Sequence, residues 1–345
     1  MTGSAIRFLQ FDGRRVAYAA TGDGPPLVAP AWWVSHLELD WADDAFRGLW
    51  EAVGDGYTLV RYDRLGVGMS DRDVRSEDLT LDGEVALLRA VLDELALHDV
   101  TLAGGSSGGM AAIAFAARSP ERVSRLLLYG AYADGPAITS KKVRDSVVAT
   151  VRSHWGLGSR VLADMFLGDT TSAEQERMAR YQRAAASPEI AAALLDFIYR
   201  TDVRSELERV RAPTLVVHRR GDRAIPYRLG RELAAAIPGA TLIPLDGSAH
   251  FPWAGDWRAA ARALRTVLAP EAPVRIDGEP AAVRLSGRER EVLALVASGL
   301  SDQEIAEQLV LSRHTVHRHV ANIRHKLGRG SRTAAVAEAA RLGLL

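Results

Sequence analysis

Three residues that together can turn a serine into a nucleophile each follow a predicted strand of this chain. Ser106 lies in the turn Gly-Gly-Ser-Ser-Gly, Asp222 ends the run LVVHRRGD, and His250 follows LIPLDGSA. A neutral serine is a poor nucleophile until a histidine takes its proton and a carboxylate fixes the tautomer of that histidine. Taken alone, His250 is most simply a structural histidine and Asp222 a turn former. Their residue types make a catalytic group the functional alternative.

The turn around Ser106 has the pattern of a nucleophile elbow. Residues 99–118, DVTLAGGSSGGMAAIAFAAR, indicate a strand, a tight turn and a helix, with Gly104-Gly105-Ser106-Ser107-Gly108 matching G-x-S-x-G. In such a turn the serine has a strained backbone, and bulky neighbours would clash with it. The pentapeptide alone also fits a glycine-rich connection in another α/β fold.

The rest of the first 267 residues predicts the scaffold that would bring these side chains together. Apolar runs alternate with amphipathic segments, which indicates a doubly wound, mainly parallel sheet covered by helices on both faces. The runs are PLVAPAWW, YTLVRYD, DVTLAGG, RLLLYGAY, PTLVVHRRGD and ATLIPLDGSAH. Residues 6–20 alternate around Asp12-Gly13, which predicts a β-hairpin. Residues 133–209 contain no strand pattern and predict a helical cap over one edge of the sheet.

Residues 1–267 resemble the α/β-hydrolase fold family. RYDRLGVGMSDR, residues 61–72, is similar to a D-x-R-G-x-G-x-S loop of that family. The family carries its triad acid and histidine where this chain has Asp222 and His250, and the order serine, acid, histidine is the family's order, so the resemblance implies a catalytic triad of Ser106, Asp222 and His250. The resemblance implies an oxyanion hole made by the backbone N–H of Ser107 and by one from the loop after PLVAP, which we assign to Trp32. Members often have His-Gly at this loop, whereas this chain has Ala-Pro-Ala-Trp-Trp at 29–33.

Four aromatic residues stand next to the expected site in the sequence: Trp32, Trp33, Phe251 and Trp253. Tryptophan most often belongs to a protein core. Adjacency to two active-site loops favours instead an apolar, aromatic-lined ligand pocket.

The last sixty residues have a different character. From Arg284 to Leu345 there are ten Lys or Arg against six Asp or Glu, and four of the nine histidines lie there, although the whole chain is formally neutral. Helix signals follow in succession: capping boxes at Ser286–Glu289 and Ser301–Glu304, a cap at Ser312, and a fourth helix from about Arg332 to Arg341. Residues 268–282 are proline-rich and predict a linker to an all-α domain at 283–345.

This tail resembles the LuxR/FixJ-type helix-turn-helix domain. The resemblance is carried by RERE-VL, GLS-x-x-EIA, S-x-x-TV-x-x-H and N-I-x-x-KLG. Independently, helical spacing predicts a buried stripe made of Val316, Val320, Ile323 and Leu327, which leaves a basic face exposed.

By similarity, His317, Arg318 and Ala321 would approach base edges of double-stranded DNA, and Ser312, Thr315 and Lys326 would contact phosphates. Arg313 also lies on the outward face, with Arg324 and His325. Many relatives have lysine where this chain has His317, so the operator preference of relatives does not carry over.

Composition excludes several classes of protein. The chain has no cysteine, which rules out disulfides, thiolate metal sites and a cysteine nucleophile. It has no apolar stretch long enough for a membrane span and no signal-peptide core, so we expect a cytoplasmic protein without membrane attachment. We expect neither a cofactor nor a metal.

Two functional hypotheses remain open from the sequence. The first is a transcription regulator, homodimeric on DNA, whose hydrolase-like domain binds and slowly hydrolyses a small apolar ester- or lactone-like ligand. The alternative is a working serine esterase or lactonase that the DNA-binding tail localises or autoregulates. A weaker third hypothesis makes the tail an oligomerisation module only. Fold alone does not decide among them.

Overall fold

The computed structural model describes residues 5–268, 287–309, 311–326 and 331–341 of the chain. The chain divides into two compact units, Met1–Ile276 and Asp277–Leu345. The linker predicted at 268–282 falls almost entirely outside the described residues.

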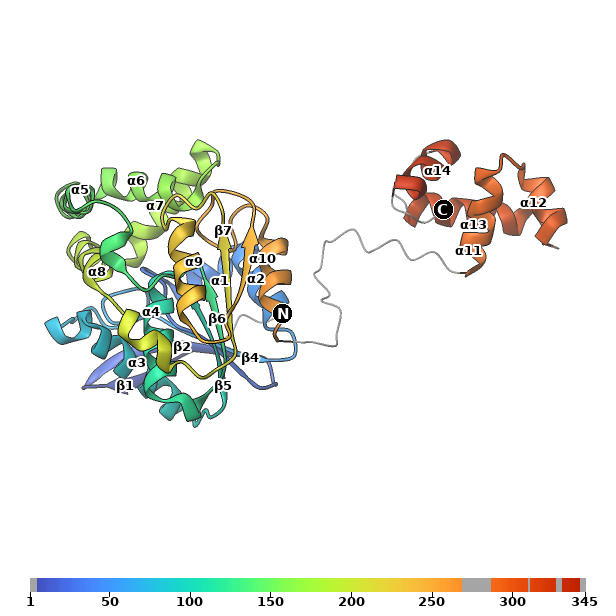
Figure 1. The fold of residues 1–345 in the computed structure, drawn as a ribbon. Coiled ribbons are helices and arrows are strands. Elements are labelled where there is room, and N and C mark those ends of the chain that lie inside the picture. The colour runs from blue at the N-terminus through green and yellow to red at the C-terminus, as the bar shows by residue number, and fades with distance from the viewer. Residues whose placement is uncertain (1–4, 269–286, 310, 327–330, 342–345) are drawn as a thin grey trace. The chain divides into compact units, whose positions relative to one another are not determined.

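The first unit is built on one eight-stranded sheet, which confirms the predicted doubly wound α/β class (Figure 1). Its strands follow the order β1-β2-β4-β3-β5-β6-β7-β8. Pairs β1–β2 and β2–β4 are antiparallel, and the remaining pairs are parallel. The strands are β1 (Ile6–Phe11), β2 (Arg14–Thr21), β3 (Pro26–Ala29), β4 (Thr58–Tyr62), β5 (Val100–Gly105), β6 (Val123–Tyr129), β7 (Thr214–Arg219) and β8 (Thr241–Leu245).

The predicted hairpin is formed by β1 and β2. Asp12 has φ 49° and Gly13 has φ 77°, and two successive positive φ angles are what a two-residue turn of this hand requires. The turn sets the register that pairs Phe11 with Arg14.

Helices cover both faces of the sheet. Helices α2 and α10 pack against each other on one side, and α3 and α4 pack together on the other (Figure 1). Every residue of β5 and almost every residue of α4 is buried, so the strand and helix that flank Ser106 form the centre of the core. The helices are α1 (Leu37–Ala42), α2 (Asp44–Val53), α3 (Leu81–Glu94), α4 (Ser107–Arg118), α9 (Tyr227–Ala236) and α10 (Trp257–Arg265).

Residues 133–209 form the helical cap that the sequence predicted. Between β6 and β7 the chain makes α5 (Lys141–Ser153), α6 (Trp155–Leu167), α7 (Ser172–Ala185) and α8 (Pro188–Arg200), joined by short turns and flanked by 3-10 helices. Each of α5, α7 and α8 begins at a serine or threonine whose hydroxyl accepts from a backbone N–H of the first turn.

The second unit consists of four described helices, α11 (Gly287–Ala297), α12 (Asp302–Leu309), α13 (Arg313–Lys326) and α14 (Arg332–Arg341). The capping box at Ser301 is present: its N–H donates to Glu304 Oε2 at 2.7 Å. The box predicted at Ser286 lies outside the described residues. Within both units, none of the described helices has the length and apolarity needed to cross a bilayer.

Candidate active site and DNA-binding surface

Ser106 sits on the elbow between β5 and α4. Its backbone has φ 49° and ψ −124°, a region that costs a non-glycine residue about 1–3 kcal/mol and persists only when the surroundings impose it. One restraint is its own N–H, which donates to Tyr129 O at 3.0 Å. The hydroxyl caps no helical N–H, although Ser106 is the N-cap residue of α4. The side chain is thus held in place without being used structurally.

The glycines around Ser106 are needed for close approach of other segments. A Cβ on Gly105 would lie 1.9 Å from Cζ2 of Trp32, and one on Gly108 would lie 2.8 Å from the carbonyl oxygen of Pro30. The loop after β3 therefore passes directly against the elbow. Neither contact leaves room for a side chain, which is the physical reason for a turn this rich in glycine.

Asp222 and His250 form a buried pair. The Nδ1 of His250 lies 2.8 Å from Oδ2 of Asp222, while Oδ1 of Asp222 accepts from the N–H groups of Ala224 and Ile225 at 2.9 Å each. Burial alone would raise the pKa of Asp222, but the charge of His250 and hydrogen bonds from His218 and His250 hold it well below its usual range. An ionised Asp222 fixes the proton of His250 on Nδ1.

The other ring nitrogen of His250 is left available. Its Nε2 is buried and has no hydrogen-bond partner within the described part of the chain, so Ser106 and His250 are not bonded to each other. Gly130, which follows the strand bonded to Ser106, has its Cβ position 3.1 Å from Cε1 of His250. The structure thus gathers the loops of all three predicted residues around the end of β6.

Hydrogen bonds from the cap fix the loop that carries Asp222 and the loop that carries His250. The backbone N–H of His250 donates to the carbonyl of Phe166 at 2.7 Å. Asp169, three residues further along the cap, accepts from Ser248 Oγ at 2.9 Å and from Arg223 Nη2 at 2.6 Å. These hydrogen bonds between the cap and the two loops could not be predicted, because nothing in the sequence of residues 166–169 indicates them.

Three of the four predicted pocket aromatics form one cluster with His250. The ring of Trp32 lies 5.9 Å from that of His250, 5.5 Å from Phe251 and 4.9 Å from Trp253. Trp33 instead packs against Trp155 and Phe166 of the cap. Phe166 joins the two groups, since its ring is 5.8 Å from that of His250. All of these side chains except Trp155 and Trp253 are buried.

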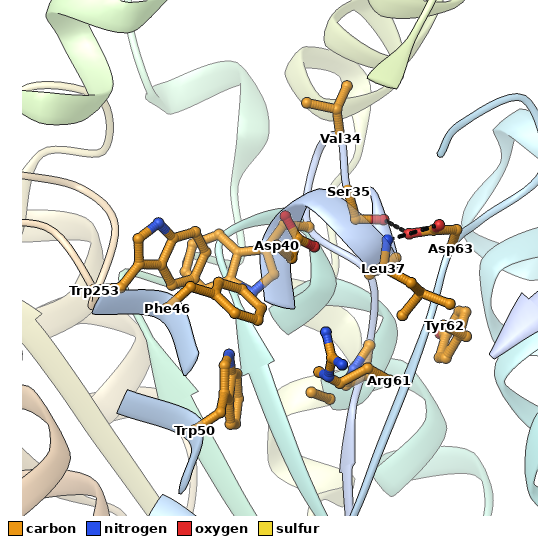
Figure 2. Close-up of a pocket in the computed structure, with 14 residues that line it drawn as sticks. Val34, Ser35, Leu37, Asp40, Phe46, Trp50, Arg61, Tyr62, Asp63 and Trp253 are labelled. Carbon is orange, nitrogen blue, oxygen red and sulfur yellow. Dashed lines mark hydrogen bonds between the residues drawn. The ribbon is translucent and has the colours of Figure 1, made fainter. Parts of the chain in front are cut away.

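Two hollows adjoin this cluster. A cavity of about 20 Å³ is lined by Trp32 among other residues. Figure 2 shows Trp253 on its border. A groove of about 1220 Å³ runs between the end of α1 and the start of α2, the α6–α7 region of the cap and the segment from β8 to α10. Asp40, Phe46 and Trp253 line both, so these three side chains separate the cavity from the groove.

The loop expected to supply the oxyanion hole is fixed by a buried ion pair. Arg64 donates through Nη2 to the carbonyl of Ala31 at 2.7 Å, and its Nη1 lies 3.0 Å from Glu84. Ser107 is the first residue of α4, where N–H groups have no partner inside the helix. The assignment of the hole to Ser107 and Trp32 stays a prediction.

In the second unit, Val316, Val320 and Ile323 are buried as predicted, with Val292, Ile305 and other residues of a separate core. Leu327 lies outside the described residues. Among the predicted DNA-contacting residues, Ser312, Arg313 and His317 are exposed, and Thr315 is half-buried. The side chains of Arg318, Ala321 and Lys326 are not among those the structure describes.

Two polar contacts shape the exposed face of α13. Ser312 Oγ accepts from the N–H of Thr315 at 3.1 Å, so Ser312 caps the helix as predicted. Nδ1 of His317 lies 3.4 Å from Asp302 Oδ2, and Asp302 also pairs with Arg332 of α14 at 2.6 Å. The imidazole of His317 is thereby placed beside the start of α12.

Comparison with known families and proteins agrees with both units. The profile described as "alpha/beta hydrolase fold" matches residues 36–253, and that described as "Bacterial regulatory proteins, luxR family" matches residues 283–339. A 2-hydroxy-6-oxononadienedioate/2-hydroxy-6-oxononatrienedioate hydrolase from Cupriavidus pinatubonensis is 31% identical over 235 residues, which are 64% of this chain and 78% of the relative.

Further relatives are similar over the first unit. The AB hydrolase superfamily protein YisY from Bacillus subtilis is 27% identical over 250 residues, covering 66% of this chain and 86% of the relative. Among solved structures, the enol-lactonase from Burkholderia xenovorans superposes with a TM-score of 0.63 at 25% identity, covering 76% of this chain and 98% of the other. The matched range 36–253 of the family profile includes the cap and the three predicted catalytic positions.

Proposed function

Because the chain belongs to the α/β-hydrolase fold family and ends in a luxR-family helix-turn-helix domain, we propose that it is a transcription regulator whose hydrolase-like domain binds a small apolar ester- or lactone-like ligand. The observation that carries this proposal is the joining of a DNA-binding domain to a domain in which the Asp222–His250 pair and the Ser106 elbow are intact. A DNA-binding domain needs an input, and the aromatic cluster beside His250 supplies a ligand-binding surface.

The chemistry of the site is slow acyl transfer. Ser106 attacks the carbonyl carbon of the ligand while Nε2 of His250 takes the hydroxyl proton, and Asp222 stabilises the imidazolium that results. The N–H groups of Ser107 and Trp32 hold the oxyanion. His250 then returns the proton to the leaving alkoxide, and water releases the acyl group. Nε2 of His250 has no partner within the described part of the chain and is therefore free to accept the Ser106 proton once a ligand aligns the two side chains.

The relatives support a carbonyl ligand in this site. The compared proteins are named as hydrolases of an oxo-dienedioate and as an enol-lactonase, both of which act on carbonyl compounds. A second candidate function, a working esterase or lactonase, is favoured by the same Asp222–His250 pair. Steady-state turnover of a simple activated ester separates them: a dedicated esterase would turn over many times per minute, and the regulator would release product far more slowly than it acylates.

We expect the protein to occupy DNA as a homodimer. One recognition helix buries little surface, and paired half-sites one helical turn apart are the usual remedy. On α14, Ala337 and Ala340 are exposed while Ala335 and Ala339 pack into the core of the unit, so one small-residue face is free for close helix contact. Ala337→Arg should weaken operator binding at least tenfold. Sedimentation that shows one protomer per operator at saturation would contradict the dimer.

Two substitutions on α13 should act differently. Arg318→Ala should cost roughly 1–3 kcal/mol on the preferred site and relax the preference for one base pair, because a base contact carries sequence information. Lys326→Ala should weaken all sequences alike and reduce the slope of affinity against salt by about one charge. Binding isotherms at several salt concentrations measure both. Identical salt slopes for Lys326→Ala and the wild type would argue against its phosphate contact.

A further inference from the structure

The cavity of about 20 Å³ is lined by polar groups that the hydrolytic chemistry does not use (Figure 2). Nη1 of Arg61, Nε1 of Trp50 and Nε1 of Trp32 are buried and have no hydrogen-bond partner within the described part of the chain. All three are donors that cannot accept a hydrogen bond. Figure 2 shows the guanidinium of Arg61 and the indole nitrogen of Trp50 directed into the same region. The lining of this cavity therefore carries three hydrogen-bond donors that have no acceptor among the described residues.

Arg61 makes this arrangement costly unless an acceptor is present. The residue is 5% exposed, and its guanidinium lies over the rings of Trp41 at 4.3 Å and Phe46 at 5.5 Å. Such contacts offset part of the desolvation of a cation. They leave Nη1 without an acceptor in the part of the chain that the structure describes, and an unsatisfied buried charged donor is destabilising.

The neighbouring carboxylates already accept hydrogen bonds from other groups. Asp63 accepts from Ser35 Oγ at 2.6 Å and from the N–H groups of Leu37 and Met69 at 3.1 and 2.9 Å. Asp40 accepts from Tyr181 of the cap at 2.6 Å and from the N–H of His36 at 3.2 Å. Both carboxylates attract the charge of Arg61, but neither accepts a hydrogen bond from its Nη1. An acceptor for Arg61, Trp50 and Trp32 can be supplied from outside the protein, by a water molecule or by an anion.

We propose that this cavity binds a monovalent anionic group, and that in the ligand-bound protein this group is a carboxylate of the ligand. The volume admits a halide ion or the oxygens of a carboxylate. Asp40, Phe46 and Trp253 form the wall shared with the groove, and Trp32 connects the cavity to the aromatic cluster at His250. The second half of the proposal rests on the proposed function, and it narrows the ligand to a carbonyl compound that also carries a carboxylate.

Asp40 couples anion binding to a proton. Burial and the charge of Asp63 raise the pKa of Asp40 to about 7, against the lowering effects of Tyr181, Arg61 and the His36 N–H. Asp43, Glu174, Arg177 and Arg180 line the groove together with Asp40. An anion beside Asp40 favours its neutral form, so binding takes up a proton. About nine-tenths of Asp40 is protonated one unit below its pKa and about one-tenth one unit above, so the apparent Kd should be roughly tenfold weaker at pH 8 than at pH 6.

The test uses the full-length protein and its tryptophan fluorescence, at constant ionic strength. Sodium bromide, sodium acetate and sodium hexanoate are titrated at pH 6 and pH 8. The wild type should bind all three saturably, about tenfold more weakly at pH 8, and hexanoate most tightly because its chain can pack against the apolar lining at Phe46 and Trp253. Asp40→Asn keeps an acceptor for Tyr181 and should bind equally at both pH values.

Arg61→Met should lose saturable binding while its circular dichroism stays that of the wild type. If Arg61→Met does not fold, Trp50→Phe removes one donor and should weaken binding several-fold. Bromide binding with hexanoate no tighter than acetate would show a site for free inorganic anions and refute the ligand carboxylate. No saturable binding, or binding unaffected by Arg61→Met and Trp50→Phe, would refute the site. None of these outcomes depends on the reactivity of Ser106, so failure here and failure of the proposed function are distinguishable.

Discussion

A fluorophosphonate should label Ser106 of the wild type, and Asp222→Asn should slow that labelling by about three to four orders of magnitude. The substitution keeps the size of the side chain but removes the charge that fixes the His250 proton on Nδ1, and the wrong tautomer leaves no base for the serine. Mass spectrometry of the labelled peptide follows the rate.

The matched controls are Ser106→Ala and His250→Gln. Ser106→Ala should not label at all and should lose hydrolysis of an activated ester, whereas His250→Gln should resemble Asp222→Asn, because residues of such a group act as a unit. Equal labelling rates in the wild type and Asp222→Asn would show that the triad is not functional. A wild type that never labels would leave a binding site and no nucleophile.

The second large effect concerns DNA. Residues 277–345 alone should fold and bind the operator, and residues 1–276 should show no specific binding. The second unit has its own buried core, including Val292, Ile305, Val316 and Ala339, so we expect it to fold without the first unit. Specific sites are typically bound 10³–10⁷-fold more tightly than other DNA. Residues 1–276 should therefore bind the operator no more tightly than they bind other DNA.

Circular dichroism and salt-dependent binding of the two pieces measure this. As a control, Val316→Asp in the 277–345 piece should abolish both its helicity and its binding, because it buries a charge in a small core. A folded 277–345 piece whose DNA affinity did not change with salt would rule out the regulator and leave an oligomerisation domain.

Much of the site could be predicted from the sequence because its signals are local. The elbow, the acid and the histidine each follow a strand within a few residues, and the strand order of the family brings their loops to one edge. The hairpin at Asp12-Gly13 and the box at Ser301–Glu304 are equally local, since turn and cap preferences act over four residues.

What the sequence did not indicate depends on contacts between distant segments. Tyr181 reaches Asp40 across 141 residues, and Phe166 reaches His250 from the cap. The sequence around Arg61 gives no sign that its side chain lines a cavity, because most of the other lining residues come from distant segments. Adjacency of Trp33 to Trp32 in the sequence does not decide which ring faces the site: the chain bends at Trp33, whose ring packs against Trp155 and Phe166 of the cap.

The central claim is that occupancy of the first unit changes the DNA affinity of the second. An operator selected from random DNA by the full-length protein gives the readout, and a phosphonate on Ser106 gives a defined occupant. The affinity of labelled protein should differ from that of unlabelled protein by a factor of about 5–150, the usual range for coupled sites. Ser106→Ala treated with the same reagent should keep the unlabelled value. Equal operator affinities for fully labelled and unlabelled wild type would contradict the account.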